Sequence, residues 1–296
     1  MVYFHVSDLD FTLDACPELP RPERVLMTTP EHFEVAYVIN PHMAGNVGAV
    51  DRDEALRQWT ALREAYVALG FDVAVVKGRP GLPDMVFCAN QTLPYLDGGS
   101  GRRGVVLSRM RAPERRDEVP YFAAFFRDLG YETTELPAHV RAFEGMGDAL
   151  RHPGRALLWG GYGFRTDPEA YEVLTGRLGV PVLALRLEDP DFYHLDTCLC
   201  VLDEATALIY PGAFDADGLG LLRRFFPRLL EAPEDEARRR MACNAHSPDG
   251  RHVIIQRGNA HTCRMLTEAG FTPVEVETGE FLKAGGSVFC MKLMFW

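Results

Sequence analysis

The feature that most constrains the fold of this chain is a regular alternation of short strand-like runs with amphipathic helical runs along its whole length. The strand-like runs are rich in Val, Ile, Leu and aromatic residues and are bounded by Gly, Pro or Asp, which is the usual pattern of β-strands. They span residues 33–40, 72–76, 85–90, 104–108, 156–160, 180–185, 197–202, 205–210, 252–256 and 288–293.

Helical periodicity is clearest over residues 51–70, where Leu56, Trp59 and Leu62 recur on one face and Gly70 stands where a helix ends. Further helices are predicted at 116–129, 168–178, 217–225 and 259–269. The recurring unit is therefore two strands, a helix and another strand, about fifty residues long. Without a strict repeat or a long linker, this pattern predicts one compact α/β domain, with two domains as the alternative.

Composition and charge narrow the class of protein. The chain has 296 residues and a formal net charge of −11, which disfavours nucleic-acid and anionic-membrane partners. It contains no run of about eighteen apolar residues, and its first residues lack the pattern of a secretory signal. Seven cysteines scattered through such a chain are typical of reduced thiols. We therefore expect a cytoplasmic protein without a membrane partner.

One of these cysteines has a distinctive setting. Cys290 lies in the stretch Gly-Gly-Ser-Val-Phe-Cys, and glycines beside a strand allow a ligand or another backbone to approach closely. A nucleophilic cysteine needs a histidine or a positive charge nearby. Taken alone, however, Cys290 is more typical of a residue packed in the core.

A histidine and an aspartate lie two residues apart in the stretch Phe-Tyr-His-Leu-Asp-Thr. On an extended segment His194 and Asp196 would project from the same face, and a carboxylate near an imidazole suits general acid–base chemistry. One alternative is a histidine hydrogen-bonded at a strand end. Another is a metal site formed by His194, Cys198 and Cys200, although this spacing matches none of the common zinc patterns.

Two further segments combine carboxylates with turn residues. Glu144 and Asp148 are bracketed by glycines in Glu-Gly-Met-Gly-Asp, a polar turn that could bind a cation or simply be solvated. Asp84 and Asn90 flank an apolar run, where they could also be ordinary turn and capping residues. None of these motifs is specific alone, but their order along the chain is.

The ordered motifs PDMVFCAN, FEGMGD, HLDT and GGSVFC resemble those of the guanidino-group-modifying superfamily, which includes dimethylarginine dimethylaminohydrolase, arginine deiminase, arginine dihydrolase and glycine amidinotransferase. The resemblance covers residues 33–296. It implies the pentein fold, a five-bladed α/β propeller with pseudo-fivefold ββαβ modules. We accordingly expect a single catalytic domain over residues 1–296, with residues 1–32 as an N-terminal extension.

The same resemblance implies roles for individual residues. Cys290 would be the nucleophile, His194 the general acid–base, and Glu144 the acid that completes the triad. Six further positions would contact the substrate: Asp84, Asn90, Arg109, Arg165, Asp196 and, as a weaker candidate, Asn40. Arg109 and Arg165 fall where family members bind the substrate α-carboxylate, and an arginine offers a planar fork to such a group.

Two departures from the family pattern leave the substrate open. The motif Glu-Gly-Met-Gly-Asp is one residue longer than the family's EGGD, so either Glu144 or Asp148 could be the catalytic acid. Asn90 replaces the aspartate typical of dimethylarginine hydrolases and deiminases, as in arginine dihydrolases. A neutral amide can hydrogen-bond a guanidinium but cannot neutralise its charge.

The predicted function is cysteine-dependent hydrolysis of arginine or an arginine derivative through an S-alkylthiouronium intermediate. The resemblance implies a small guanidino molecule as the partner and neither a metal nor an organic cofactor, and it is compatible with a homo-oligomer. Two alternatives stay open. An amidinotransferase would pass the amidino group to an amine, and a non-catalytic binding protein can share the fold.

Overall fold

The structure is a computed structural model that describes all 296 residues, and its strands form five separate sheets. In four of the sheets an inner strand pairs antiparallel with a middle strand, which pairs in parallel with an outer strand. A helix connects each middle strand to its outer strand. The fifth sheet keeps the middle and outer strands, and an isolated bridge between His246 and Ile254 stands where an inner strand would pair.

Each strand is named here by its place in its sheet. The inner strands are β15 (Leu293–Phe295), β4 (Thr92–Leu96), β7 (Ala149–Arg151) and β10 (Leu199–Val201). The middle strands are β2 (Arg24–Thr28), β5 (Arg103–Leu107), β8 (Leu158–Tyr162), β11 (Thr206–Ile209) and β13 (His252–Gln256). The outer strands are β3 (Asp72–Val76), β6 (Glu132–Thr134), β9 (Val182–Arg186), β12 (Arg228–Glu231) and β14 (Thr272–Val276).

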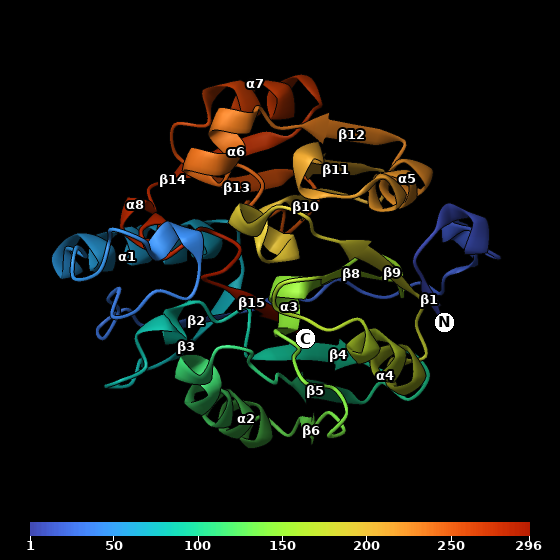
Figure 1. Cartoon of the computed structure of the whole chain (residues 1–296), viewed down its shortest axis with the longest axis horizontal. Coiled ribbons are helices and arrows are strands. Elements are labelled where there is room, and N and C mark those ends of the chain that lie inside the picture. The colour runs from blue at the N-terminus through green and yellow to red at the C-terminus, as the bar shows by residue number, and fades with distance from the viewer.

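The helices lie mainly outside the ring of sheets (Figure 1). Those that connect middle to outer strands are α1 (Arg52–Ala68), α2 (Val119–Asp128), α4 (Glu169–Leu178), α5 (Ala216–Phe225) and α7 (Ala260–Glu268). The remaining helices are α3 (Gly145–Asp148), α6 (Glu234–Arg240) and α8 (Gly279–Leu282). The short α3 is the exception to the outer arrangement, since it lies near the centre of the ring (Figure 1). No helix is both long and apolar enough to span a bilayer.

The two ends of the chain meet in one module. Strand β15, close to the C-terminus, pairs antiparallel with β2, so that Leu293 lies opposite Leu26. Strand β1 (Val2–Tyr3) also joins a module, because it pairs in parallel with β9. The segment 1–32, expected as an extension, therefore contributes strands to two sheets. Pairing of the ends closes the ring, as the pentein architecture requires.

The predicted helices are present within a few residues of their expected bounds, and their ends follow local chemistry. The Asp51 side chain accepts a hydrogen bond from the Glu54 amide and so caps the start of α1. Gly179, at φ 65°, ends α4 in the left-handed conformation that glycine adopts readily. Trp59 and Leu62 of α1 are buried, as their place on the apolar face predicts, whereas Leu56, assigned to the same face, is 51% exposed.

Three predicted strands are wrong, and all three lie beside the centre of the ring. Residues 33–40 and 85–90 form turns and 3₁₀ segments, and the run 288–293 is a turn until β15 begins at Leu293. Phe33, Met85 and Val288 are nevertheless buried. These runs are apolar because they are enclosed by the surrounding modules, and burial does not require an extended backbone.

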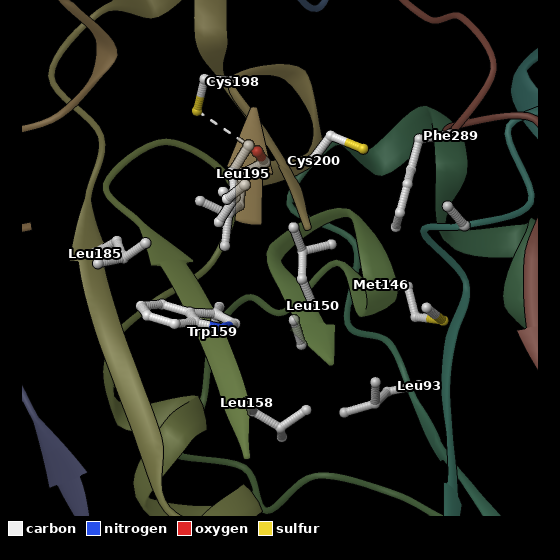
Figure 2. Close-up of a cluster of buried hydrophobic side chains, with 14 of the residues drawn as sticks. Leu93, Met146, Leu150, Leu158, Trp159, Leu185, Leu195, Cys198, Cys200 and Phe289 are labelled. Carbon is white, nitrogen blue, oxygen red and sulfur yellow. Dashed lines mark hydrogen bonds between the residues drawn. The ribbon is translucent and has the colours of Figure 1, made fainter. Parts of the chain in front are cut away.

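Side chains from several modules meet in the core. Met146 from α3, Trp159 from β8 and Phe289 near the C-terminus belong to one buried cluster, together with Leu195 (Figure 2). This packing holds the turns around the centre of the ring against the sheets. The candidate functional residues lie in those turns.

Candidate active site

The candidate residues lie in the segments that lead into the inner strands. Asp84 belongs to a 3₁₀ turn (Pro83–Val86) before β4, and Glu144 immediately precedes α3 and β7. His194 and Asp196 lie at the turn Leu195–Thr197 before β10, and Cys290 lies shortly before β15. Because the inner strands surround a common centre, the turns at their starts converge there (Figure 1).

These turns enclose a small cavity of about 280 Å³. Cys290 and His194 both line it, and each is only 2% exposed. Glu144 and Asp196 contact this pair without lining the cavity themselves. The polar and charged lining residues are Asn40, Asp84, Asn90, Arg115, Arg165, Tyr193, His194 and Cys290.

Glu144 and His194 form a buried acid–imidazole pair. Glu144 Oε2 lies 2.7 Å from His194 Nε2 and 3.0 Å from Arg165 Nη1. Burial alone would raise the pKa of Glu144, but Arg165 and His194 outweigh it and hold the pKa well below its ordinary value. Glu144 is therefore a carboxylate that orients the imidazole and leaves Nδ1 for proton transfer.

Asp148 has a different place in the same turn. Its Oδ1 accepts a hydrogen bond from the Leu195 amide, and its Oδ2 accepts one from the Thr166 hydroxyl. Burial raises the pKa of Asp148 to about 6. Asp148 thus anchors the backbone beside His194, while Glu144 is the acid that contacts the imidazole.

The glycines of the lengthened turn are required by close packing against Asn90. Gly145 has φ +55°, and a Cβ there would stand 2.7 Å from the carbonyl oxygens of Asn90 and Thr92. A Cβ on Gly147 would stand 2.2 Å from Asn90 Nδ2. The turn can therefore hold an extra residue, Met146, and still bring Glu144 to His194.

The Cys290 thiol is held between two side chains. Its Sγ lies 3.3 Å from Asp196 Oδ2 and 3.2 Å from Asn244 Nδ2. Asn244 also accepts hydrogen bonds from the backbone amides of Ser287 and Cys290 through its Oδ1. Burial, followed by the charge of Asp196, raises the pKa of Cys290 well above that of an ordinary thiol. These contacts therefore favour a thiol that donates to Asp196.

Asp84 and Asp196 are buried carboxylates without an ion-pair partner. Tyr37 donates to Asp84 Oδ2 at 2.9 Å, while Asp84 Oδ1 and Asp196 Oδ1 have no hydrogen-bond partner. Burial raises the pKa of Asp84, and it raises that of Asp196 to about 7. Two unpaired carboxylates in a closed site are the complement of a cationic ligand.

Asn90 lines the cavity and has a free donor, Nδ2, which lies beside Gly147. Its Oδ1 accepts a hydrogen bond from Arg115 Nη1 at 2.9 Å, and its Nδ2 has no partner. Arg115 in turn forms a buried ion pair with Glu118 at 2.9 Å. Arg115 therefore fixes the orientation of the amide, so that Asn90 can donate a hydrogen bond to a bound molecule.

Asn40 and Arg165 also line the cavity. Asn40 Nδ2 donates to the Ala284 carbonyl at 3.0 Å, and Arg165 Nη2 donates to the Ile39 carbonyl at 2.8 Å. Arg165 also lies over the ring of Tyr193, with Cζ 4.8 Å from the centroid. Both predicted residues are thus at the cavity and connect it to the segment that follows β2.

Arg109 lies away from the cavity. Its guanidinium donates to the backbone carbonyls of Leu136, Pro137 and Val140. These contacts fix the loop that leads to Glu144. We therefore do not assign Arg109 a contact with the substrate.

The metal alternative finds no support in the geometry, because the structure contains no group of His, Cys, Asp and Glu side chains arranged to hold a metal ion. Cys198 Sγ contacts the Leu195 carbonyl at 3.5 Å (Figure 2), and Cys200 lies within β10 in the core. The two thiols pack with apolar neighbours.

Sequence reasoning missed Asn244, Arg115 and Tyr37. The position of Asn244 could have indicated a role, because Asn244 lies just before the strands of the fifth sheet, as the other site residues lie just before the strands of theirs. Arg115 stands in a run of charged residues that reads as a solvated surface, yet it is only 4% exposed. Only the assembled ring shows that these side chains reach the centre.

Comparison with known proteins agrees with this geometry. The family model described as eukaryotic N,N-dimethylarginine dimethylhydrolase matches residues 42–294. The chain belongs to this family. An N(G),N(G)-dimethylarginine dimethylaminohydrolase of Mycobacterium tuberculosis is 40% identical over 275 residues, which cover 93% of this chain and 86% of that protein.

A second group of relatives is bifunctional. The arginine dihydrolase/ornithine cyclodeaminase ArgZ of Synechocystis is 40% identical over 274 residues, covering 91% of this chain. The chain spans only 37% of the length of ArgZ, and the same share of AgrE from Nostoc. The solved N-terminal domain of ArgZ, a cysteine-to-serine variant bound to substrate, superposes with a TM-score of 0.83 at 39% identity, covering 92% of this chain and 97% of that domain.

These matches place the chain in the guanidino-group-modifying superfamily and confirm the α/β pentein fold. A dimethylarginine dimethylaminohydrolase structure, 22% identical with a TM-score of 0.78, has the same fold.

Proposed function

We propose that this chain is a cysteine-dependent hydrolase that cleaves a C–N bond at the guanidinium carbon of arginine or an arginine derivative. One observation carries the proposal. A buried thiol, an imidazole held by a carboxylate and Asp84 border one small cavity, and a second carboxylate without an ion partner, Asp196, contacts the thiol. A family that acts on such compounds supports the same reading.

Binding of the cation prepares the nucleophile. A guanidinium between Asp84 and Asp196 satisfies their free oxygens and gives each carboxylate a positive partner. Asp196 then no longer has to accept a hydrogen bond from Cys290, and the positive charge stabilises a thiolate. A bound cation should therefore lower the pKa of Cys290 from the raised value that burial and Asp196 give it.

The reaction then proceeds in two balanced steps. The Cys290 thiolate attacks the guanidinium carbon and forms a C–S bond. His194 protonates the departing nitrogen, and the C–N bond breaks to release ammonia or a substituted amine. The product is an S-alkylthiouronium. His194 next removes a proton from water, which attacks the same carbon and breaks the C–S bond. The ureido product and the thiolate are released.

Asn90 favours arginine dihydrolase chemistry as the specific form. Its Nδ2 donates a hydrogen bond where an aspartate would accept one. An amide donor can hydrogen-bond the ureido oxygen of the first product, whereas a carboxylate would repel that oxygen. The neutral product is therefore retained for a second attack by Cys290. In the second round Cys290 attacks the ureido carbon and displaces ammonia. Water then breaks the new C–S bond to give a carbamate, which loses carbon dioxide and leaves ornithine. The solved dihydrolase domain supports this form, and the mycobacterial relative supports dimethylarginine as the competing substrate.

We assign the whole chain to one catalytic domain, since β2 and β15 join its ends in a single module. We assign it to the cytoplasm because all seven cysteines are free thiols.

The decisive experiment is product analysis by mass spectrometry with arginine, dimethylarginine and agmatine as separate substrates. Ornithine with two equivalents of ammonia from arginine supports the dihydrolase form. Citrulline alone from arginine rejects it and leaves a deiminase, and dimethylamine from dimethylarginine identifies the competing substrate. An amidino group transferred to an added amine would identify a transferase.

A matched pair of cysteine variants tests the mechanism. Cys290→Ser is expected to abolish turnover of every guanidino substrate, whereas Cys263→Ser, which changes a partly exposed thiol in the outer helix α7, is expected to retain it. Full turnover by Cys290→Ser would overturn the proposed function.

A further inference from the structure

A second cavity lies at the other ends of the inner strands. Its lining includes Arg151 at the end of β7, Val201 at the end of β10 and Trp296 after β15. It shares no lining residue with the catalytic cavity, although its Lys292 lies just before β15 and two residues after Cys290. The space, about 660 Å³ including its open part, is called the back pocket below.

The charged residues that line the back pocket are all basic. Arg21, Arg151 and Lys292 line it, and none of its eighteen lining residues is acidic. None of the three forms an ion pair. A concentration of unpaired positive charge is unexpected in a chain whose formal net charge is −11, because nearby carboxylates are plentiful.

Two donors in this pocket are buried and have no partner. Lys292 is fully buried, and its Nζ forms no hydrogen bond, although it lies 3.1 Å from the centroid of the Phe289 ring. The Ser247 hydroxyl is likewise buried without a partner, in a residue only 6% exposed. An unpaired ammonium and an unpaired hydroxyl cost free energy unless a ligand satisfies them.

The two arginines are held in place by contacts that do not neutralise them. Arg151 donates to the Pro94 carbonyl and lies over the Trp296 ring, with Cζ 4.7 Å from the centroid. Arg21 packs against Gly250, where a Cβ would stand 2.9 Å from its nitrogens. Both guanidinium groups therefore keep their charge available to the pocket.

The two histidines of the pocket add polarity without charge. His152 Nε2 lies 3.1 Å from the Glu204 carbonyl, and its Nδ1 accepts from Trp159. His246 Nδ1 lies 2.9 Å from the Tyr66 hydroxyl. Burial lowers the pKa of His152 to about 4 and lowers that of His246 as well. The positive charge thus comes from the two arginines and the lysine.

We propose that the back pocket binds a small oxyanion, either free phosphate or the phosphate group of a small metabolite, with Lys292 and Ser247 as its buried donors and Arg21 and Arg151 as its flanking cations. Charge-assisted hydrogen bonds from an ammonium and from guanidinium groups are the usual means of holding such a group. The proposal does not rest on the guanidino chemistry of the catalytic cavity, although the charges of Asp196 and Cys290 also act on Lys292.

The test is titration calorimetry on the full chain, with inorganic phosphate in one arm and glycerol 3-phosphate in the other, each at constant ionic strength set with sodium chloride. We expect saturable binding at one site and a higher melting temperature with phosphate than with chloride. Preference for the free ion or for the ester identifies the source of the anion.

Variants locate the site. Lys292→Met is expected to bind phosphate at least about tenfold more weakly, and Arg21→Ala, at the less buried side, is expected to weaken it as well. Lys77→Met removes an exposed cation elsewhere and is expected to bind like the unaltered chain. Equal effects of phosphate and chloride, or unchanged phosphate affinity in both pocket variants, would overturn the proposal.

Discussion

The two cavities at opposite ends of the inner strands are electrostatic opposites. The catalytic site has Asp84 in the cavity wall and Asp196 beside Cys290, and neither forms an ion pair. The back pocket has Arg21, Arg151 and Lys292, which likewise form no ion pair, although the charge of Asp196 acts on Lys292 from the catalytic side. In the catalytic cavity burial raises the pKa values of the two acids, and in the back pocket it lowers that of the lysine.

An unpaired buried charge indicates a ligand site only where other buried charges nearby are paired. Arg165 and Arg115 also line the catalytic cavity, but each is matched by Glu144 or Glu118. The matched pairs position other groups. The charged side chains without an ion pair can be paired by a bound ligand of opposite charge.

Removing the nucleophile would produce the largest effect on the catalytic side. Cys290→Ser is expected to lower kcat at least about 10³-fold, because a hydroxyl cannot replace the thiolate under the same base. Steady-state kinetics gives the change, and calorimetry on the variant shows whether arginine still binds. A variant that loses binding together with turnover would point to a misfolded site.

Neutralising Asp84 tests whether the catalytic cavity binds a cation through carboxylates that have no ion-pair partner. Asp84→Asn keeps the shape of the side chain and its neighbour Tyr37 but removes the charge, so KM for arginine is expected to rise about 10- to 100-fold. Asp53→Asn, at an exposed acid of α1, serves as the control. An effect on kcat with unchanged KM would contradict a binding role for Asp84.

The pH dependence of binding tests Asp196. Its pKa of about 7 means that the carboxylate form, which attracts the cation, is lost as the pH falls through 7. Arginine binding to Cys290→Ser should therefore weaken up to about tenfold for each pH unit below 7. The double variant with Asp196→Asn should lose this part of the dependence, and an unaltered profile would exclude Asp196 as its source.

The smallest expected effect is on stability at the back pocket. Burial lowers the pKa of Lys292 from 10.5 to about 7, so the folded chain binds fewer protons than the unfolded chain between these values. The stabilising contribution of this group is full above pH 10.5 and is lost as the pH falls toward 7.

Lys292→Met should therefore be more stable than the unaltered chain at pH 7, by on the order of 1–3 kcal/mol without phosphate, and the gain should shrink as the pH rises toward 10. Urea unfolding at several pH values measures it. A less stable variant at neutral pH would mean that Lys292 has a partner in solution.

Much of the fold could be predicted from local pattern. The helices follow apolar periodicity and end at caps such as Asp51 and Gly179, both of which act through neighbouring backbone atoms. The wrong strands share one cause. The runs around Phe33, Met85 and Cys290 are apolar because they are enclosed on all sides, and composition does not distinguish an enclosed turn from a buried strand.

The α/β modules could be predicted from the sequence because they depend on local periodicity. The residue types of the site, Cys290, His194 and the acids, could be predicted from the order of the motifs. Only the tertiary structure decided that Glu144, not Asp148, contacts His194 and that Arg109 lies outside the cavity. It also brought Asn244 to Cys290 and left Lys292 without a partner. Such pairings depend on which turns meet at the centre of the ring, and closing the ring requires strands from both ends of the chain.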